Sequence, residues 1–454
     1  MTQVGYLENL NPWINGEQTL DETDDVIETG GSGSSNTLMP SNEGASVLLG
    51  DTMIPITFEY DAAIANRQLL SNKLGISDQL SCAILENGSV ACWGYNQYGQ
   101  SGNSSSTSTF SSTPELTDTM PGNQKAVALD TSKYTGCALL ENGSVACWGW
   151  TWGYGEMGDG TQTMGVRAPG LTGSFGSHRS AVEVSTANQG ACVLLDNGSV
   201  SCWGEGSKGT IGDGITTDYR SSPTPTASLP NGKKAVALTS GHTHHCALLE
   251  DGNVACWGSN SQGQLGDNST TNRNTPTLTQ PLGAPAIAIE SDYAHTCALL
   301  SNGSVVCWGD NAYGQIGNGA SGGDILTPTF VSNITGTVVS VTTSVANTCA
   351  LLYNNSVMCW GDNTHGQIGN GTTSSGTTPD YTSSFATNQT KLMLDGGGNG
   401  SCALVDNGSM HCWGENSKGS IGDGTTNDAD TPTLVDTSMT FLTTHITELT
   451  SASA

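Results

Sequence analysis

Short apolar runs alternate with segments rich in Gly, Ser, Thr and Asn along most of this chain. A run such as KAVAL, which begins near Lys125 and again near Lys234, precedes a second run built from Cys, Ala and Leu. An Asn-Gly turn follows, and then a third run that ends in Cys-Trp-Gly. Runs of this length predict β-strands, and the Asn, Gly and Thr-Pro segments between them predict tight turns and loops.

This unit of strand, hairpin and loop recurs along the chain. Cys-Trp-Gly occurs seven times, and its tryptophans are spaced by 55, 55, 54, 51, 52 and 53 residues. Small sheets repeated at such a period form the blades of a propeller. We therefore expect an all-β fold, a seven-bladed β-propeller. The seven tryptophans recur with the repeat, so we expect them in the core or between blades: Trp93, Trp148, Trp203, Trp257, Trp308, Trp360 and Trp413.

All fourteen cysteines fall in the repeat, two per copy and ten residues apart. A three-residue hairpin loop, such as Glu86-Asn87-Gly88, places the first cysteine directly opposite the second. The third loop residue needs positive φ, and it is Gly in six copies and Asn355 in the other. Opposed cysteines can form a disulfide. Reduced, buried cysteines are the alternative, and zinc is disfavoured because the spacing is too long. The predicted disulfides join Cys82 to Cys92, Cys137 to Cys147, Cys192 to Cys202, Cys246 to Cys256, Cys297 to Cys307, Cys349 to Cys359 and Cys402 to Cys412.

The copies do not extend over the whole chain. Residues 1–45 form an acidic segment rich in Gly and Ser, which we expect to be flexible. Residues 46–69 form a short strand segment that leads into the propeller, and residues 70–454 form the propeller itself. We expect Phe441-Leu442-Thr443-Thr444 to add a strand to the first blade and to close the ring.

Composition narrows the possible partners. The chain holds 13 Lys and Arg against 41 Asp and Glu, which gives a formal net charge of −28. Binding to nucleic acid requires many cationic contacts with phosphate, so DNA and RNA are poor candidates. An anionic membrane surface is disfavoured for the same reason. No apolar stretch of 18 residues occurs, so the sequence predicts no membrane insertion.

Seven disulfides point to an oxidising compartment, so we expect an extracellular or cell-surface location. The N-terminal MTQVGYLENLNPW lacks the basic and apolar regions of a signal peptide. We therefore expect that a signal was removed or that the chain is a fragment of a longer precursor. Asn-x-Ser sequons at the hairpin turns suggest a glycoprotein, although Asn-Gly-Ser is also good turn chemistry. These sequons begin at Asn87, Asn142, Asn197, Asn302 and Asn407.

Two of the copies carry a specific resemblance. GHTHHCALLEDGNVACWGSNSQGQLGDN and SDYAHTCALLSNGSVVCWGDNAYGQIGNG resemble the regulator-of-chromosome-condensation repeat, and the likeness covers about residues 70–450. The resemblance implies a seven-bladed propeller. It fits best the cysteine-paired type found in secreted or surface proteins of bacteria and archaea.

The family's eukaryotic founder is a nuclear nucleotide-exchange factor that also binds chromatin. This chain departs from it in its acidity and its paired cysteines, so that activity does not carry over. Other relatives bind proteins, one of them a secreted β-lactamase inhibitor.

Catalytic and metal-binding motifs are missing from the sequence. It contains no serine nucleophile elbow, no H-E-x-x-H and no recognisable carboxylate pair, so we predict that the protein is not an enzyme and needs no cofactor. His242, His244 and His245 cluster before Cys246, and two histidines in alternation can bind a metal. His244 aligns with His295, however, at a usual position of the repeat, which favours a structural role. Oxygen ligands in the loop after Cys-Trp-Gly, such as Asp267, lack the dense carboxylate spacing of a calcium loop.

One loop departs from the repeat. After Cys-Trp-Gly most copies continue with small polar residues, but the second copy carries Trp150, Trp152 and Tyr154. The first copy adds Tyr95 and Tyr98 in the equivalent loop. Exposed Trp and Tyr are typical of binding hot spots and also stack on sugar rings, so we predict that these five residues bind a partner. The alternative is that the tryptophans fill a gap between blades one and two, or cover the N-terminal segment.

These observations favour a recognition or adhesion module that binds a protein or glycan partner outside the cell. The alternative is a structural subunit of a larger surface assembly, with self-association through the N-terminal strand segment. A more distant alternative is an enzyme that acts on a polysaccharide.

Overall fold

The computed structural model describes residues 39–41, 44–49, 52–56, 73–104, 108–216, 218–383, 385 and 390–436. The chain divides into two compact units, residues 1–69 and residues 70–454. The first unit holds an antiparallel three-stranded sheet with the order β1-β2-β3. Its strands are β1 (Met39–Ser41), β2 (Gly44–Leu49) and β3 (Thr52–Ile56).

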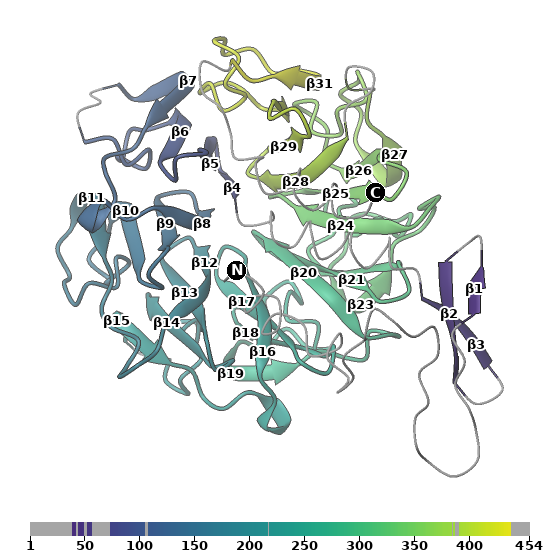
Figure 1. Cartoon of the computed structure of the whole chain (residues 1–454), viewed down its shortest axis with the longest axis horizontal. Coiled ribbons are helices and arrows are strands. Elements are labelled where there is room, and N and C mark those ends of the chain that lie inside the picture. The colour runs from purple at the N-terminus through teal and green to yellow at the C-terminus, as the bar shows by residue number, and fades with distance from the viewer. Residues whose placement is uncertain are drawn as a thin grey trace. The chain divides into compact units, whose positions relative to one another are not determined.

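The second unit is a seven-bladed β-propeller, as the repeat predicts. Its described residues form seven antiparallel sheets of four strands, and the four strands of each sheet are consecutive in the sequence. The first strands of neighbouring blades pack side by side around the whole ring and surround its centre (Figure 1). The hydrophobic clusters lie between adjacent blades, so the core is a set of interblade layers.

The strands of the first four blades have the following bounds. Blade 1 comprises β4 (Leu74–Ser77), β5 (Leu80–Ile84), β6 (Val90–Tyr95) and β7 (Phe110–Leu116). Blade 2 comprises β8 (Ala126–Thr131), β9 (Thr135–Leu140), β10 (Val145–Thr151) and β11 (Gly165–Leu171). Blade 3 comprises β12 (Ala181–Ala187), β13 (Gly190–Leu195), β14 (Val200–Gly204) and β15 (Arg220–Pro225). Blade 4 comprises β16 (Ala235–Ser240), β17 (His244–Leu249), β18 (Val254–Gly258) and β19 (Arg273–Leu278).

The remaining three blades follow the same plan. Blade 5 comprises β20 (Ala286–Asp292), β21 (His295–Leu300), β22 (Val305–Gly309) and β23 (Ile325–Phe330). Blade 6 comprises β24 (Val338–Thr343), β25 (Asn347–Leu352), β26 (Val357–Gly361) and β27 (Gly376–Tyr381). Blade 7 comprises β28 (Lys391–Gly397), β29 (Gly400–Val405), β30 (Met410–Gly414) and β31 (Ala429–Leu434). Short 3-10 turns occur at Pro121–Asn123 and Pro230–Gly232.

Each hairpin between the second and third strands of a blade carries one disulfide, in the predicted register. The turn residues take the predicted positive φ, 82° at Gly88 and 71° at Asn355. All fourteen cysteines are bonded, so the alternatives of reduced cysteines and zinc are not what the structure shows. The disulfides join Cys82 to Cys92, Cys137 to Cys147, Cys192 to Cys202, Cys246 to Cys256, Cys297 to Cys307, Cys349 to Cys359 and Cys402 to Cys412.

An irregularity that the repeat did not predict follows the second cysteine of every pair. There the register between the third and fourth strands shifts, and the glycine of Cys-Trp-Gly takes positive φ, 102° at Gly94. A Cβ at Gly94 would lie 2.2 Å from the carbonyl oxygen of Gln79, so only glycine fits. The shifts lie between Cys92 and Gly94, Cys147 and Gly149, Cys202 and Gly204, Cys256 and Gly258, Cys307 and Gly309, Cys359 and Gly361, and Cys412 and Gly414.

The repeated tryptophans join each blade to the next, which confirms their predicted place in the core. All seven are at most 1% exposed. The indole N–H of each donates to a backbone carbonyl in the preceding blade, as from Trp148 to Gln100 at 3.0 Å and from Trp308 to Gln264 at 2.9 Å. A glycine at positive φ, such as Gly102, packs against the same ring and leaves no room for a side chain.

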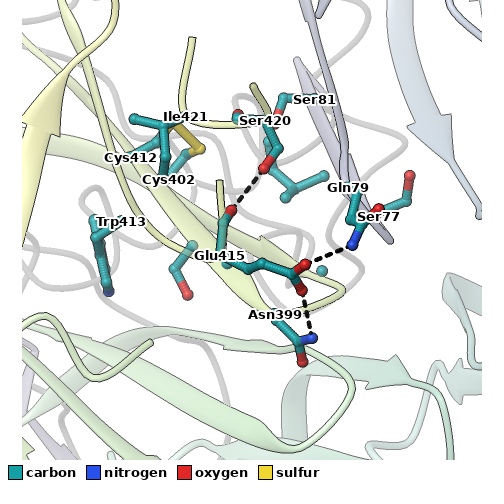
Figure 2. A pocket seen from close by; sticks show the side chains of 14 residues that line it. Ser77, Gln79, Ser81, Asn399, Cys402, Cys412, Trp413, Glu415, Ser420 and Ile421 are labelled. Carbon is teal, nitrogen blue, oxygen red and sulfur yellow. Dashed lines mark hydrogen bonds between the residues drawn. A yellow bond between two sulfur atoms is a disulfide. The ribbon is translucent and has the colours of Figure 1, made fainter. Parts of the chain in front are cut away.

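The ring closes where blade 7 packs against blade 1. Trp93 donates to the carbonyl of Ser420 at 2.9 Å, the same bond that joins the other blades. The Glu415 carboxylate accepts from Gln79 at 2.6 Å and from Asn399 at 2.8 Å (Figure 2). The cavity between these groups has a volume of only about 10 Å³, which is too small for a ligand. The closing strand expected at 441–444 lies outside the described residues.

Candidate functional site

The two faces of the propeller differ in chemistry. In blade 2 the first strand ends at Thr131, the second strand returns antiparallel to it, and the third strand ends again on the first side, at Thr151. The turn between the first two strands and the loop after Cys-Trp-Gly therefore share one face in every blade. We call this the rim face. The hairpin turns between paired cysteines form the opposite face, which we call the tip face.

The repeat is regular on the tip face and irregular on the rim face. The central residue of the tip turn is Asn in six blades and Asp251 in blade 4. By contrast, the residue four positions before the first cysteine of each blade, in the rim turn, is a different type in all seven blades. These rim residues are Asp78, Lys133, Asn188, His242, Tyr293, Val345 and Gly398. Packing of equivalent blades does not require such variety, so the rim face is where the chain has an individual surface.

All seven rim residues line one pocket of about 270 Å³ on the propeller axis. The pocket reaches the surface, because Tyr293 is 42% exposed and the Lys133 side chain is 43% exposed. Below the rim its wall consists of Ser and Thr hydroxyls and of the carboxylates of Asp130, Asp292 and Asp395. These three residues come from the first strands of blades 2, 5 and 7.

The axial carboxylates also join blades. Asp130 accepts from the backbone N–H of Thr186 in the next blade at 2.6 Å, and Asp395 accepts from that of Ile76 at 3.2 Å. Asp292 accepts from Gly398, two blades further on, at 3.3 Å. Each carboxylate supplies an acceptor for a backbone N–H that would otherwise have no hydrogen-bond partner at the centre of the ring.

The chemical environment of these carboxylates is unusual. Burial raises the pKa of Asp130 to about 6 and the pKa of Asp292 to about 7. Burial also raises the pKa of Asp395 and Glu290 well above the usual range, and neighbouring carboxylates add to the effect. Perturbed carboxyl groups that share a pocket are typical of functional sites.

Few cations offset this charge. Lys133 forms an ion pair with Asp78 at the rim, with a distance of 2.5 Å between nitrogen and oxygen. Lys73 donates to the backbone carbonyl of Val127, and burial lowers its pKa. Within the described part of the propeller, neither Asp130, Asp292 nor Asp395 forms an ion pair. The described residues therefore provide no counter-ion to the carboxyl groups deep in the pocket.

Beside the pocket, the rim face carries an aromatic cluster of five half-buried rings. Tyr98 contacts Tyr95 at a centroid distance of 6.0 Å, Trp150 at 5.4 Å and Tyr134 at 5.5 Å. Trp152 contacts Trp150 and Tyr134, both at 5.7 Å, and all five contacts are edge-to-face. The cluster joins blade 1 to blade 2. Tyr134 is next to the rim residue Lys133, so the cluster adjoins the mouth of the pocket.

A buried carboxylate holds the loop that carries the two tryptophans. Glu156, only 2% exposed, accepts from the Thr151 hydroxyl at 2.5 Å and from the backbone N–H of Trp152 at 2.7 Å. It also accepts from the N–H of Tyr154 at 3.0 Å. The equivalent residue in blades 1, 4, 5 and 6 is Gln. Acceptor-only Glu suits a loop that directs three donors to one side chain.

Four of the five predicted binding residues thus lie together, and the fifth, Tyr154, is 40% exposed in the same loop. The rings of Trp150 and Trp152 partly fill the space between blades one and two, and their indole N–H groups are buried. The packing alternative therefore describes part of the arrangement, and the binding of a partner by these residues stays a prediction. Sequence reasoning missed Tyr134 and the axial carboxylates. An alignment of the copies on the first cysteine would have found Asp130 and Asp395, each seven residues before it, but not Asp292, which lies five residues before it.

His244 and His295 have the structural role that the repeat predicts. The Nε2 atom of His244 lies 2.9 Å from the Thr296 hydroxyl, and that of His295 lies 3.0 Å from the Thr348 hydroxyl, in each case in the next blade. Burial lowers the pKa of both histidines, and of His245, to about 3. In the described part of the chain, no group of three or more His, Cys, Asp or Glu side chains is placed to hold a metal ion. That part also contains no helix long and apolar enough to span a membrane.

Comparison with known proteins gives a consistent match. The family model described as the RCC1-like domain matches residues 150–454, and the regulator of chromosome condensation (RCC1) repeat matches residues 73–100. The chain is 28% identical to the human E3 ubiquitin-protein ligase HERC2 over 355 residues, which are 77% of this chain but 7% of HERC2. It is 27% identical to the ultraviolet-B receptor UVR8 of Arabidopsis thaliana over 302 residues, or 66% of this chain and 67% of UVR8.

Solved structures show the same fold. Human WBSCR16 superposes with a TM-score of 0.69 at 18% identity, over 77% of this chain and 95% of that protein. Yeast RCC1 (Prp20), in its complex with Kap60, superposes with a TM-score of 0.67 at 18% identity, over 86% and 90% of the two chains.

Proposed function

Since this chain belongs to the RCC1-like domain family, we propose that it is a non-catalytic module that binds a protein partner through its rim face. The observation that carries this proposal is the contrast between the two faces. Seven equivalent rim positions carry seven different residue types, whereas the tip turns are nearly identical. A surface on which the repeat is broken in every blade can recognise one partner in one orientation.

The aromatic cluster is the proposed anchor of this surface. Tyr and Trp supply large contact areas at low cost in conformational entropy and dominate binding hot spots. Tyr98, Trp150 and Trp152 are half-buried, so their ring packing holds them in place before a partner arrives. Relatives support a protein partner, since yeast RCC1 (Prp20) was solved bound to Kap60. A glycan that stacks on the same rings is the competing ligand class, and the experiment below separates the two.

We place this module outside the cell or at its surface. Seven disulfides, all of them bonded, are typical of proteins that fold in oxidising compartments. We further propose that the chain is of the cysteine-paired secreted type and that the tip sequons are glycosylated. Exposed asparagines at those tips include Asn87, Asn142 and Asn407. Glycans there would leave the rim face free.

The test is capture of a partner with the full-length chain, followed by measurement of the Kd for variants. Tyr98→Ala and Trp152→Ala should weaken binding at least tenfold, because they remove hot-spot area. Tyr313→Ala is the matched control. Tyr313 occupies the position of Tyr98 in blade 5, is 51% exposed and lies outside the cluster.

The proposal fails if Tyr98→Ala and Tyr313→Ala bind equally well while both variants keep the melting temperature of the wild type. Capture that survives deglycosylation of the partner indicates a protein ligand. Loss of capture on deglycosylation assigns the rim face to a glycan instead.

A further inference from the structure

The axial pocket contains polar groups that the fold does not use. The Thr131 side chain is 94% buried and lines the pocket, yet its hydroxyl has no hydrogen-bond partner. The side-chain oxygen of Asn188, on the rim of the same pocket, is also buried without a partner. The hydroxyl of Thr186, which lines the pocket as well, is likewise buried without a partner. Buried polar atoms are nearly always hydrogen-bonded, so three unsatisfied oxygens in one pocket indicate a missing donor.

The surrounding charge identifies the type of donor. Asp130, Asp292 and Asp395 line the pocket, and no described cation forms an ion pair with any of them. Their carboxylates interact, since Asp130 raises the pKa of both Asp292 and Asp395. A ligand that carries positive charge and donates hydrogen bonds would satisfy the carboxylates and the unpartnered oxygens together.

We propose that the axial pocket binds a primary ammonium group carried on a flexible aliphatic chain. An ammonium group offers three donors in different directions, which suits acceptors that converge from several blades. Asp130, Asp292 and Asp395 each already accept a backbone N–H on both oxygens, so the in-plane geometry that a guanidinium needs is partly occupied. This site is separate from the aromatic cluster, and the inference does not rest on the proposed function.

Size and geometry distinguish this ligand from a bare metal ion. The pocket of about 270 Å³ is many times the space that one water needs, so a single ion would leave most of it empty. In the described residues no three metal-ligating side chains are close enough to hold an ion. An aliphatic chain would extend from the deep carboxylates to the rim, where the exposed Tyr293 ring offers an apolar surface.

The probe is N-acetyl-lysine amide, and its binding to the full-length protein is measured by saturation-transfer NMR. N-acetyl-norleucine amide, which has a similar shape but no charge, is the matched ligand control. We expect saturation of the lysine δ and ε methylenes and at least tenfold weaker binding of the norleucine compound. The double variant Asp130→Asn/Asp395→Asn should reduce lysine-amide binding at least tenfold. Asp406→Asn, at an exposed tip position, should bind like the wild type.

A second variant keeps the test decisive if the double variant does not fold. Thr131→Val keeps the shape of the side chain and removes only a hydroxyl that has no partner, so the protein should fold normally. We expect it to weaken lysine-amide binding by about three- to tenfold. Unchanged binding by folded Thr131→Val, or equal binding of the norleucine compound, overturns the proposal. Saturable binding of Ca²⁺ without any binding of the amine also overturns it.

Two sources could supply the ammonium group, a free polyamine or a lysine of a protein partner. The two experiments that distinguish them use the wild-type protein. Spermidine that binds more than tenfold more tightly than the lysine amide indicates a free polyamine. Competition of the lysine amide with the captured protein partner indicates a partner lysine. If amine binding fails while Trp152→Ala still weakens the partner, the axial site is wrong and the rim-face proposal stands.

Discussion

The raised pKa of Asp292 makes a specific contribution to the pH dependence of stability. Burial raises the pKa of this carboxyl from 3.8 to about 7. A carboxyl with a raised pKa stabilises the folded state below its unfolded pKa, and that stability is lost as the pH rises through the folded pKa. Between pH 8 and pH 5 the folded state therefore takes up a proton on Asp292 that the unfolded chain does not.

The size of this effect follows from the same values. Two pH units below a folded pKa of about 7, the contribution is about 2.7 kcal/mol in favour of the folded state, at ~1.36 kcal/mol per unit. The described propeller has roughly 360 residues, so its unfolding entropy is about 0.8 kcal/mol/K. The contribution then corresponds to about 3 °C in melting temperature.

The assay compares the wild type with Asp292→Asn by calorimetry at pH 5, 6, 7 and 8. The variant loses one acceptor, for the N–H of either Tyr293 or Gly398, which costs about 1 kcal/mol at every pH. Beyond that constant offset, the advantage of the wild type should grow by about 3 °C from pH 8 to pH 5. His244 and His295, whose pKa burial lowers to about 3, act in the opposite direction but equally in both proteins.

A difference between wild type and variant that stays constant from pH 5 to pH 8 would refute this reasoning. It would show that Asp292 is ionised in the folded protein over the whole range. Asp406→Asn, at an exposed tip, serves as the control and should follow the wild type at each pH.

Three further predictions concern single elements of the fold. The double substitution of Cys297→Ala and Cys307→Ala opens a hairpin of eleven residues and should lower the free energy of unfolding by about 3 kcal/mol. Chemical denaturation against the oxidised wild type measures the loss, and an unchanged denaturation midpoint would contradict the prediction. Trp308→Phe removes the indole bond to the preceding blade and leaves a small cavity, so calorimetry should show a loss of about 2–3 kcal/mol. Glu156→Ala leaves three donors of the tryptophan loop without an acceptor, and hydrogen exchange at Trp152 and Tyr154 should become at least tenfold faster. Unaltered exchange would show that Glu156 does not hold the loop.

The repeat made the propeller predictable because its signals are local. Two cysteines ten residues apart and a turn residue with positive φ determine each hairpin register, as Cys82, Gly88 and Cys92 illustrate. The period of Trp93 and its equivalents predicted the number of blades, and their burial confirmed their place. The aromatic loop was found for the converse reason, since Trp150 and Trp152 break a pattern that is otherwise regular.

The axial pocket was missed because its residues meet only when the ring closes. Asp130 and Asp395 are 265 positions apart in the chain, and neither stands out from its own strand. The rim residues escaped notice because each is ordinary by itself. Lys133 and His242 gain significance only from comparison of all seven copies at one position. Residues that are distant in the sequence and meet only in the folded ring produce no local periodic pattern.

The central claim is that the rim face, with its aromatic cluster, is the surface that binds a partner. Hydroxyl-radical footprinting of the full-length chain, alone and with the captured partner, tests it without any substitution. We predict protection of Tyr98, Trp152 and Tyr154 in the complex, with unchanged oxidation of Tyr353 at a tip turn, which is 45% exposed. Protection of Tyr353 with unchanged oxidation of the cluster would contradict it.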